Sequence, residues 1–226
     1  MRPILWVEQC ATHRTDDFNG CRLSTLCPFY KLAFASTIRL RKLIPMPKQR
    51  YVLLDRDGVI NHDSDAFIKS PDEWIPIEGS LEAIALLNAQ GYQVIVVTNQ
   101  SGVARGLLDE AMLEKIHAKM CRLVSEKGGH IAAIYFCPHG ADSACECRKP
   151  REGLLKAFAT DFNADLTKIA VIGDSLRDLQ AADAVGAKPI LVKTGKGQQT
   201  LINNPQLNIP VFENLYDAAK YITSRQ

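Results

Sequence analysis

Two aspartates, Asp55 and Asp57, follow a short apolar run that begins at Tyr51. An apolar run rich in β-forming residues that ends at a glycine, here Gly58, is typical of a buried parallel strand that stops at the functional edge of a sheet. Residues two positions apart in an extended segment point the same way, so both carboxylates can face one bound group. One can act as a nucleophile and the other as a general acid and base. The motif alone is equally compatible with an acidic exit from a strand.

Polar residues recur after later apolar runs of the chain. Thr98 follows the second run, Asp174 and Asp178 follow the fourth, and Lys149 precedes a proline and a helical pattern. Carboxylates suit Mg²⁺, while a lysine and a hydroxyl balance the charge of a transferred phosphoryl group. Each residue alone could be a strand exit, a solvated charge or a helix cap. Their order along the chain predicts phosphoryl transfer.

The elements that must position these residues alternate between strands and helices. The expected strands are 51–54, 92–97, 131–136, 169–172 and 189–192. Apolar residues at helical spacing predict helices over 81–91, over 109–128 with Asp109 as the N-cap, and over 154–162, and 211–222 predicts a short apolar piece and a closing helix. The alternation predicts an α/β fold with a doubly wound, mostly parallel sheet.

A cluster of potential metal ligands lies in the loop at 137–147. Its ligands are Cys137, His139, Cys145 and Cys147, which form two closely spaced pairs within eleven residues. Three thiolates and one imidazole complete a tetrahedral Zn²⁺ site and leave no open position for catalysis. The chain has seven cysteines, an odd number, so a metal site fits better than a disulfide framework. The alternative is a run of buried reduced cysteines.

Length and composition limit the classes of protein that fit. The 226 residues are 46% hydrophobic, which is enough to bury the core of one domain. The net charge is +2, but residues 1–50 carry nine Lys/Arg against three Asp/Glu, and the remainder has a net charge of −4. An acidic domain argues against nucleic-acid binding through phosphate neutralisation. No apolar run reaches 18 residues and no secretory pattern begins the chain, so we expect a cytoplasmic protein with no membrane partner.

Residues 1–48 show no sustained helical or alternating pattern. We expect them to form an N-terminal extension of unknown role, with Met46 as an alternative natural start. An Arg-containing targeting peptide is a second interpretation, although its scattered apolar residues fit poorly. Residues 49–226 are expected to form the catalytic domain.

The four motifs together resemble the haloacid dehalogenase superfamily of phosphotransferases. Its DxDG, Thr, Lys and GDxxxD motifs match 55–58, Thr98, Lys149 and 173–178. More narrowly, LDRDGVIN at 54–61, TNQSGVARG at 98–106, and CPH at 137–139 leading to CECRKP at 145–150 are similar to the D-glycero-D-manno-heptose 1,7-bisphosphate phosphatases. Histidinol-phosphate phosphatases share much of these strings. The similarity covers about residues 50–197 and implies a fold with the small zinc loop and no large cap domain.

The resemblance implies a role for each catalytic residue. Asp55 would attack phosphorus, and Asp57 would protonate the leaving oxygen and then activate water. Thr98 and Lys149 would hold the phosphoryl oxygens. Mg²⁺ would bind the Asp55 carboxylate, the Asp57 backbone carbonyl and Asp174.

The resemblance also implies which residues contact the substrate. These are Asp63, Ser64, Asp65, Ala66, Thr98, Asn99, Gln100, Ser101, Arg148 and Lys149. One position departs from the family pattern, because Ser175 stands where many relatives have lysine after the fourth-motif aspartate. One phosphate or substrate contact is therefore in doubt.

The expected function is removal of the 7-phosphate from a heptose bisphosphate in lipopolysaccharide-precursor synthesis, by a monomer that takes a small sugar phosphate. A histidinol-phosphate phosphatase or another small phosphomonoester phosphatase is the alternative within the fold. An inactive zinc-stabilised binding or scaffold protein is the alternative of another class. A nucleic-acid 3′-phosphatase fits less well, because the catalytic domain is acidic and no aromatic and basic platform is evident.

Overall fold

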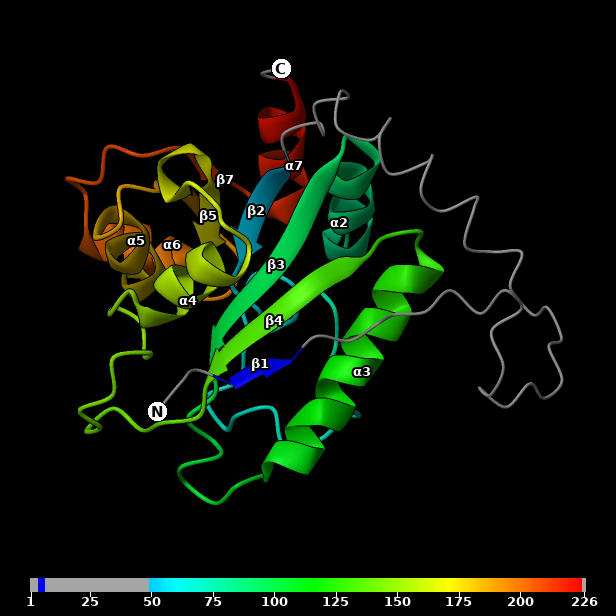
Figure 1. Ribbon diagram of the computed structural model, residues 1–226, viewed down its shortest axis with the longest axis vertical. Helices are drawn as coiled ribbons and strands as arrows, with labels where there is room; N and C mark the ends of the chain where they lie inside the picture. Colours follow the sequence, from blue (N-terminus) through cyan, green and yellow to red (C-terminus); the bar gives the residue numbers. More distant parts are fainter. Residues whose placement is uncertain (1–3, 7–48, 225–226) are drawn as a thin grey trace, which may run out of the picture. The chain divides into compact units, whose positions relative to one another are not determined.

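The computed structural model describes residues 4–6 and 49–224, and within them seven strands form one sheet (Figure 1). The strands are β1 (Ile4–Trp6), β2 (Arg50–Leu54), β3 (Tyr92–Asn99), β4 (Ile131–Cys137), β5 (Ala170–Gly173), β6 (Lys188–Val192) and β7 (Val211–Phe212), in the order β1-β4-β3-β2-β5-β6-β7. All neighbours from β4 to β7 pair in parallel, and β1 pairs antiparallel with β4. The sheet runs outward from β2 in both directions, which confirms the doubly wound, mostly parallel fold.

Helices connect successive strands from β2 to β7, one more follows β7, and together they cover both faces of the sheet. They are α2 (Ser80–Ala89), α3 (Glu110–Glu126), α4 (Gly153–Asp161), α5 (Leu176–Asp183), α6 (Gly197–Asn203) and α7 (Leu215–Ser224), with a short 3₁₀ turn at Leu166–Lys168. In β2, Val52 and Leu54 join a core with α2, α3 and α7, whereas Tyr51 and Leu53 join a core with α4 and α5. Successive side chains of a strand point to opposite faces, so a sheet covered on both sides needs an unbroken apolar run. No helix among the described residues is long and apolar enough to cross a membrane.

Local sequence explains where the long helix α3 begins and ends. The side chain of Asp109 accepts a hydrogen bond from the backbone N–H of Met112 at 2.7 Å, which confirms the expected N-cap. Leu113, Ile116 and Met120 lie buried on one face of the helix. The face packs against the sheet and places His117 of the same helix inside the protein.

Several element boundaries differ from those expected. β3 continues to Asn99 and β4 to Cys137, because the two strands stay paired at Thr98↔Phe136 and Asn99↔Cys137. Thr98 and Asn99 are polar and are not marked by hydrophobic periodicity, and Cys137 was assigned to the metal loop, so the last residues of both strands were missed. The helices α5 and α6 were also missed, because both are short and rich in polar residues.

The strand β1 lies in the N-terminal region, where no regular element was expected. Ile4, Leu5 and Trp6 pair with Phe136, Tyr135 and Ile134 on the edge of β4. A three-residue strand carries too little pattern to be recognised from sequence. Residues 7–48, including Met46, lie outside the described residues. The expected N-terminal extension and the alternative start at Met46 therefore stay predictions.

We predict that a chain beginning at Met46 folds and keeps its activity. Every motif residue lies within 49–224, and removing 1–45 takes away only β1 from the described sheet. The melting temperature should fall by less than about 3 °C, which corresponds to roughly 1 kcal/mol in a domain of this size. Thermal unfolding and limited proteolysis of both chains provide the test. A larger fall, or resistance of residues 1–45 to proteases, would show that the extension is packed.

Candidate active site

The polar strand ends meet in one pocket. Because β2 lies between β3 and β5, the carboxyl ends of these three strands bring Asp55, Thr98 and Asp174 together. The pocket has a volume of about 350 Å³. Of the predicted site residues, those that line it are Asp55, Asp57, Asp63, Ser64, Asp65, Thr98, Asn99, Gln100, Ser101, Arg148, Lys149 and Asp174.

Lys149 is buried at the base of the pocket and is only 3% exposed. Its Nζ contacts Asp178 Oδ1 at 2.6 Å, Val97 O at 2.7 Å and Asp55 Oδ1 at 3.0 Å. Burial alone would lower the pKa of Lys149, but the carboxylates of Asp178 and Asp55 raise it. The interpretation of Lys149 as a solvated charge is therefore wrong. The structure provides a fixed cation beside Asp55.

Asp55, Asp174 and Asp178 crowd together, and one ligand oxygen of each lies within 4.8 Å of the others. Burial raises the pKa of Asp55 to about 8, against the attraction of Lys149, and the neighbouring carboxylates raise it further. Burial and the Asp178 charge raise the pKa of Asp174 to about 7. Burial alone would raise the pKa of Asp178, but the charge of Lys149 and the hydrogen bonds from Lys149 and Ser175 together lower it. A divalent cation would relieve this repulsion, so the donor set fits Mg²⁺.

Two glycines allow Asp174 to approach the end of β2. A Cβ at Gly58 would lie 2.0 Å from Asp174 Oδ2, and one at Gly195 would lie 2.2 Å from the same oxygen. The backbone N–H of Lys196 donates to that oxygen at 2.8 Å. Gly58 has a φ of 81°, which also favours glycine. These two glycines and the hydrogen bond from Lys196 therefore hold the Asp174 carboxylate next to the end of β2, where the magnesium site is predicted.

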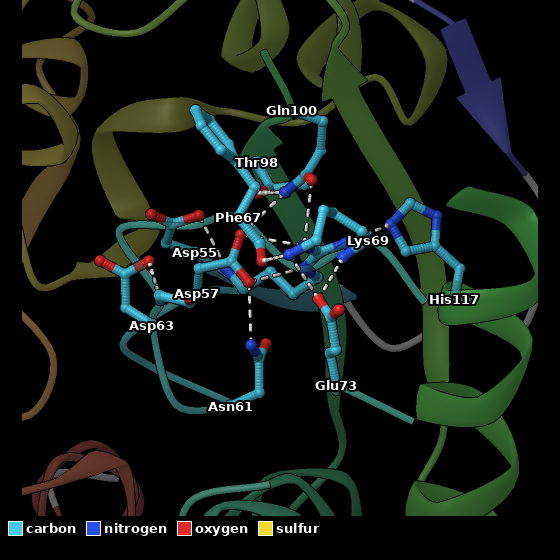
Figure 2. Close-up of polar contacts among 12 residues, drawn as sticks. Asp55, Asp57, Asn61, Asp63, Phe67, Lys69, Glu73, Thr98, Gln100 and His117 are labelled. Atoms are coloured by element: carbon cyan, nitrogen blue, oxygen red, sulfur yellow. Dashed lines mark hydrogen bonds and ion pairs between the residues drawn. The ribbon is translucent and has the colours of Figure 1, made fainter. Parts of the chain in front are cut away.

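The side chain of Asp57 points to a different set of partners (Figure 2). Arg56 donates from Nε to Oδ1 and from Nη2 to Oδ2, both at 3.0 Å. Asn61 Nδ2 donates to Oδ1 at 2.8 Å, and Gln100 Nε2 donates to Oδ2 at 2.9 Å. Sequence reasoning missed Arg56 and Asn61, both fully buried, although the string LDRDGVIN contains them. The Asp57 side chain is not part of the group formed by the carboxylates of Asp55, Asp174 and Asp178.

Two predicted substrate contacts, Gln100 and Asn99, also bind other parts of the protein. Gln100 Nε2 donates to Thr98 Oγ1 at 3.0 Å as well as to Asp57. Asn99 accepts from the backbone N–H of Lys149 and donates to its carbonyl oxygen, both at 3.1 Å. These side chains line the pocket, but they also hold Thr98 and Lys149 in place.

Ala66, a predicted substrate contact, and Ser175, the position that departs from the family pattern, both form hydrogen bonds within the protein. Ala66 does not line the pocket, and its carbonyl oxygen accepts a hydrogen bond from Lys69 Nζ at 2.9 Å. Ser175 donates its hydroxyl to Asp178 Oδ2 at 2.6 Å as part of a capping box at the start of α5. Ser175 thus orients the carboxylate that pairs with Lys149 and does not replace the lysine found in many relatives.

Three cations at the pocket wall were missed from the sequence. They are Arg105, Arg177 and Lys196, which lie in loops or at a helix start. Arg105 lies within the string TNQSGVARG and Arg177 at a variable position of GDxxxD, whereas no quoted motif contains Lys196. Lys196 Nζ pairs with Asp63 Oδ2 at 3.0 Å, which ties the loop after the first motif to the loop before α6. Burial, followed by the charges of Arg177 and Arg105, lowers the pKa of Arg148. The three arginines Arg105, Arg148 and Arg177 together place positive charge on this wall, which suits an anionic substrate.

The cysteine loop brings its four predicted ligands together. Cys147 Sγ lies 3.1 Å from Cys137 Sγ and 3.2 Å from His139 Nδ1, and Cys145 Sγ lies 3.8 Å from Cys137 Sγ. A tetrahedral site with a Zn–S distance of roughly 2.3 Å separates its ligand atoms by roughly 3.8 Å. Four ligand atoms within 4.8 Å of one another therefore fit one Zn²⁺ ion.

The loop is linked directly to Arg148. Arg148 Nη1 donates to the carbonyl oxygen of His139 at 3.1 Å, and the backbone N–H of Gly153 donates to Glu146 O at 3.1 Å. Arg148 and Lys149 follow the ligand Cys147 immediately in the chain. A metal in this loop would fix the backbone that carries both cations.

The fold and the site define the class. An aspartate pair after the central strand, with threonine, lysine and aspartate at neighbouring positions, is the arrangement of a haloacid dehalogenase-type phosphohydrolase. Residues 146–218 match the HAD-hydrolase-like family.

Comparison with individual proteins narrows the class. The D-glycero-beta-D-manno-heptose-1,7-bisphosphate 7-phosphatase of Pseudomonas putida is 50% identical over 171 residues, which cover 76% of this chain and 98% of the relative. The crystal structure of D,D-heptose 1,7-bisphosphate phosphatase from B. bronchiseptica with magnesium and phosphate has a TM-score of 0.77 at 48% identity, covering 78% of this chain and 99% of that chain. The enzyme from Burkholderia thailandensis has a TM-score of 0.61 at 43% identity and the same coverage. This chain belongs to the D-glycero-beta-D-manno-heptose-1,7-bisphosphate 7-phosphatase family.

We predict that Mg²⁺ stabilises the protein more at about pH 8 than at about pH 6. In the folded protein the pKa values of Asp55 and Asp174 are raised to about 8 and about 7. Without metal, the stability that these two groups contribute is therefore lost as the pH rises from their pKa values in the unfolded chain to their pKa values in the folded protein. Mg²⁺ needs both carboxylates deprotonated and should restore that loss. The measurement is the shift in melting temperature with about 10 mM Mg²⁺ at each pH. In Asp174→Asn the difference between the two pH values should largely disappear; its full retention would place the metal elsewhere.

We predict that Cys145→Ser releases Zn²⁺ and reduces kcat by up to about 100-fold, because about 1 Å of misplacement of Arg148 and Lys149 has that effect. Added Mg²⁺ should not restore activity, since it favours oxygen ligands. Elemental analysis beside kinetics checks both claims. Cys121→Ser is the matched control, because Cys121 is buried on α3 outside the loop. A fully active wild-type protein without zinc, purified without chelator, would contradict the assignment.

Proposed function

We propose that this protein hydrolyses the 7-phosphate of D-glycero-D-manno-heptose 1,7-bisphosphate and releases heptose 1-phosphate. The reaction proceeds through an aspartyl-phosphate on Asp55 and contributes to lipopolysaccharide-precursor (ADP-heptose) synthesis. The observation that carries the proposal is the buried contact of 3.0 Å between Lys149 Nζ and Asp55 Oδ1 at the base of the pocket, in a chain of this family.

Asp55 is the nucleophile. Its carboxylate follows β2 and lines the pocket, and apart from this face the side chain is enclosed by protein. Lys149 offsets negative charge as the phosphoryl group arrives, because it is a cation fixed by Asp178 and Val97 O. The Thr98 hydroxyl accepts a hydrogen bond from Gln100 and can therefore turn its own proton toward a phosphoryl oxygen.

Asp57 is the general acid and base. In the first step it protonates the departing sugar oxygen, and in the second it takes a proton from the water that attacks the aspartyl-phosphate. Its carboxylate lines the pocket two residues after Asp55, as both steps require.

Two metals fit the chain. The residues that would hold Mg²⁺ are the carboxylates of Asp55 and Asp174 and the backbone carbonyl of Asp57. Bound there, Mg²⁺ supplies positive charge that stabilises the transferred phosphoryl group. Zn²⁺ in the loop at 137–147 is structural, because all four of its ligand positions come from protein.

The pocket wall supports a substrate with more than one anionic group. Arg148, with Arg105 and Arg177 near it, provides positive charge beyond the position of Lys149. The loop at 63–65, held by Lys196, supplies carboxylate and hydroxyl groups that can bind sugar hydroxyls. A bisphosphorylated sugar uses both features, whereas histidinol phosphate, the nearest rival, carries one phosphate and a cationic amine.

Monomeric state and a cytoplasmic location remain predictions. Size-exclusion chromatography and cell fractionation test them. An inactive scaffold is disfavoured, because Asp55, Asp57, Lys149 and Asp174 are all present and gathered in one pocket.

The test of the proposal is phosphate release from heptose 1,7-bisphosphate, histidinol phosphate and a 3′-phosphorylated oligonucleotide, measured side by side. The heptose ester should have the highest kcat/KM, and comparable rates on all three would contradict the assigned specificity. Asp55→Asn keeps the side-chain volume but cannot form the aspartyl-phosphate, so its turnover should be abolished with the fold intact. Asp57→Asn should lose about 100-fold or more in rate. A near-normal rate in either variant would assign that role to another residue.

A further inference from the structure

A buried polar cluster of Arg56, Gln100 and His117 lies beside Asp57. Arg56 is fully buried, which is unusual for a charged residue unless its contacts compensate it. Besides Asp57, its guanidinium donates from Nη2 to Gln100 Oε1 at 3.0 Å and contacts His117 Nε2 from Nη1 at 3.3 Å. The guanidinium therefore joins three residues from three elements, namely the loop after β2, the end of β3 and the helix α3.

His117 acts as the acceptor at the far end of the cluster. Its ring is fully buried and packs edge-on against Phe136 of β4, with ring centroids 5.9 Å apart. Burial, followed by the Arg56 charge, holds the pKa of His117 well below its usual range. A neutral imidazole can accept a hydrogen bond at Nε2, whereas a protonated one could only donate. His117 is thus suited to fix the plane of the Arg56 guanidinium.

Gln100 links the cluster to the phosphoryl-binding group. Its Nε2 donates both to Asp57 Oδ2 and to Thr98 Oγ1, while its Oε1 accepts from Arg56 (Figure 2). Both ends of the amide are therefore engaged inside the protein. A shift in Arg56 would be passed to Asp57 directly and through Gln100.

We propose that Arg56, Gln100 and His117 form a positioning cluster that holds the Asp57 carboxylate in the orientation needed for proton transfer to the leaving group. This inference rests on the proposed role of Asp57 as general acid and base. None of the three residues transfers a proton. His117 acts only through Arg56, which lies 61 residues away in the sequence.

The geometry supports positioning over burial alone. The Asp57 side chain is 21% exposed on the pocket side, so it needs a rigid support on its other side. The guanidinium forms two parallel hydrogen bonds, one to each carboxylate oxygen, which fixes the carboxylate plane as a single contact cannot. Removal of the acceptor at His117 leaves those two bonds in place but frees the guanidinium to shift.

A comparison of two substrates with different leaving groups distinguishes a positioning role from a general structural role. An alkyl oxygen, as in a sugar phosphate, needs a proton as it departs, whereas p-nitrophenolate is stable enough to leave without one. Values of kcat/KM report the step in which the leaving group departs from phosphorus. A misplaced Asp57 should therefore impair the sugar ester far more than p-nitrophenyl phosphate, while a loosened fold should impair both equally.

The experiment measures kcat/KM for heptose 1,7-bisphosphate and for p-nitrophenyl phosphate in three variants of the full chain. His117→Leu removes the acceptor and should lower the value for the sugar ester by about 10- to 100-fold, but the value for p-nitrophenyl phosphate by less than about 3-fold. His117→Gln offers an oxygen near the position of Nε2 and should recover much of the loss. Met120→Ala, a buried change on the same helix, should lower the melting temperature by several degrees and leave the ratio of the two values unchanged.

Equal losses on both substrates in His117→Leu, or no loss, would overturn the positioning role. If His117→Leu does not fold, Arg56→Lys decides the question, because it keeps the charge and loses the paired hydrogen bonds. The same selective loss is expected there, and a uniform loss overturns the inference. Failure of the proposed function looks different, since the wild-type protein would then hydrolyse neither substrate or Asp57→Asn would remain active.

Discussion

The active site depends on one buried cation. Lys149 sits between Asp55 and Asp178 at the carboxyl edge of the sheet, with almost no contact with water. Removing one partner of such a buried pair typically costs about 3–5 kcal/mol, because the remaining charge is left without compensation. The carboxylates and the lysine therefore need one another as a group. Their mutual dependence keeps Asp55, the proposed nucleophile, beside a positive charge before any substrate arrives.

Much of the surrounding structure serves to hold that lysine. Asn99 clamps its backbone from the end of β3, and Ser175 orients Asp178 from the cap of α5. The predicted zinc loop ends at Cys147, two residues before Lys149, and contacts Arg148 through the carbonyl of His139. The loop contacts Arg148, β3 contacts the backbone of Lys149, and α5 supplies Asp178, the ion-pair partner of Lys149. Preorganised charges of this kind lower a barrier without rearranging during the reaction.

A second layer of buried polar contacts serves Asp57. The first layer counters charge around Asp55, whereas Arg56 and Gln100 donate hydrogen bonds to Asp57. The two aspartates are two residues apart in sequence, yet their side chains have different partners. Burial raises the pKa of Asp55 to about 8, and the carboxylates of Asp174 and Asp178 raise it further. One short motif therefore places two carboxylates in distinct environments, as the proposed roles of nucleophile and acid/base require.

The sequence by itself determined the fold class, the four motifs and the group of four candidate zinc ligands. Unbroken apolar runs predict strands buried on both faces, and the residues after them must then meet at one edge, which placed Asp55, Thr98 and Asp174 correctly. The cysteine loop was equally readable, because its four ligands are close in sequence.

Only the tertiary structure decided how distant side chains combine. His117 and Arg56 are 61 residues apart, and nothing in their local sequence indicates a contact. Gln100 was expected to bind substrate, but its amide also bonds to Asp57, Thr98 and Arg56. Ala66 was placed in the pocket by analogy and lies outside it. Periodicity reports which face of an element is buried, whereas the partner of a buried polar group is set by the packing of elements that are remote in the chain.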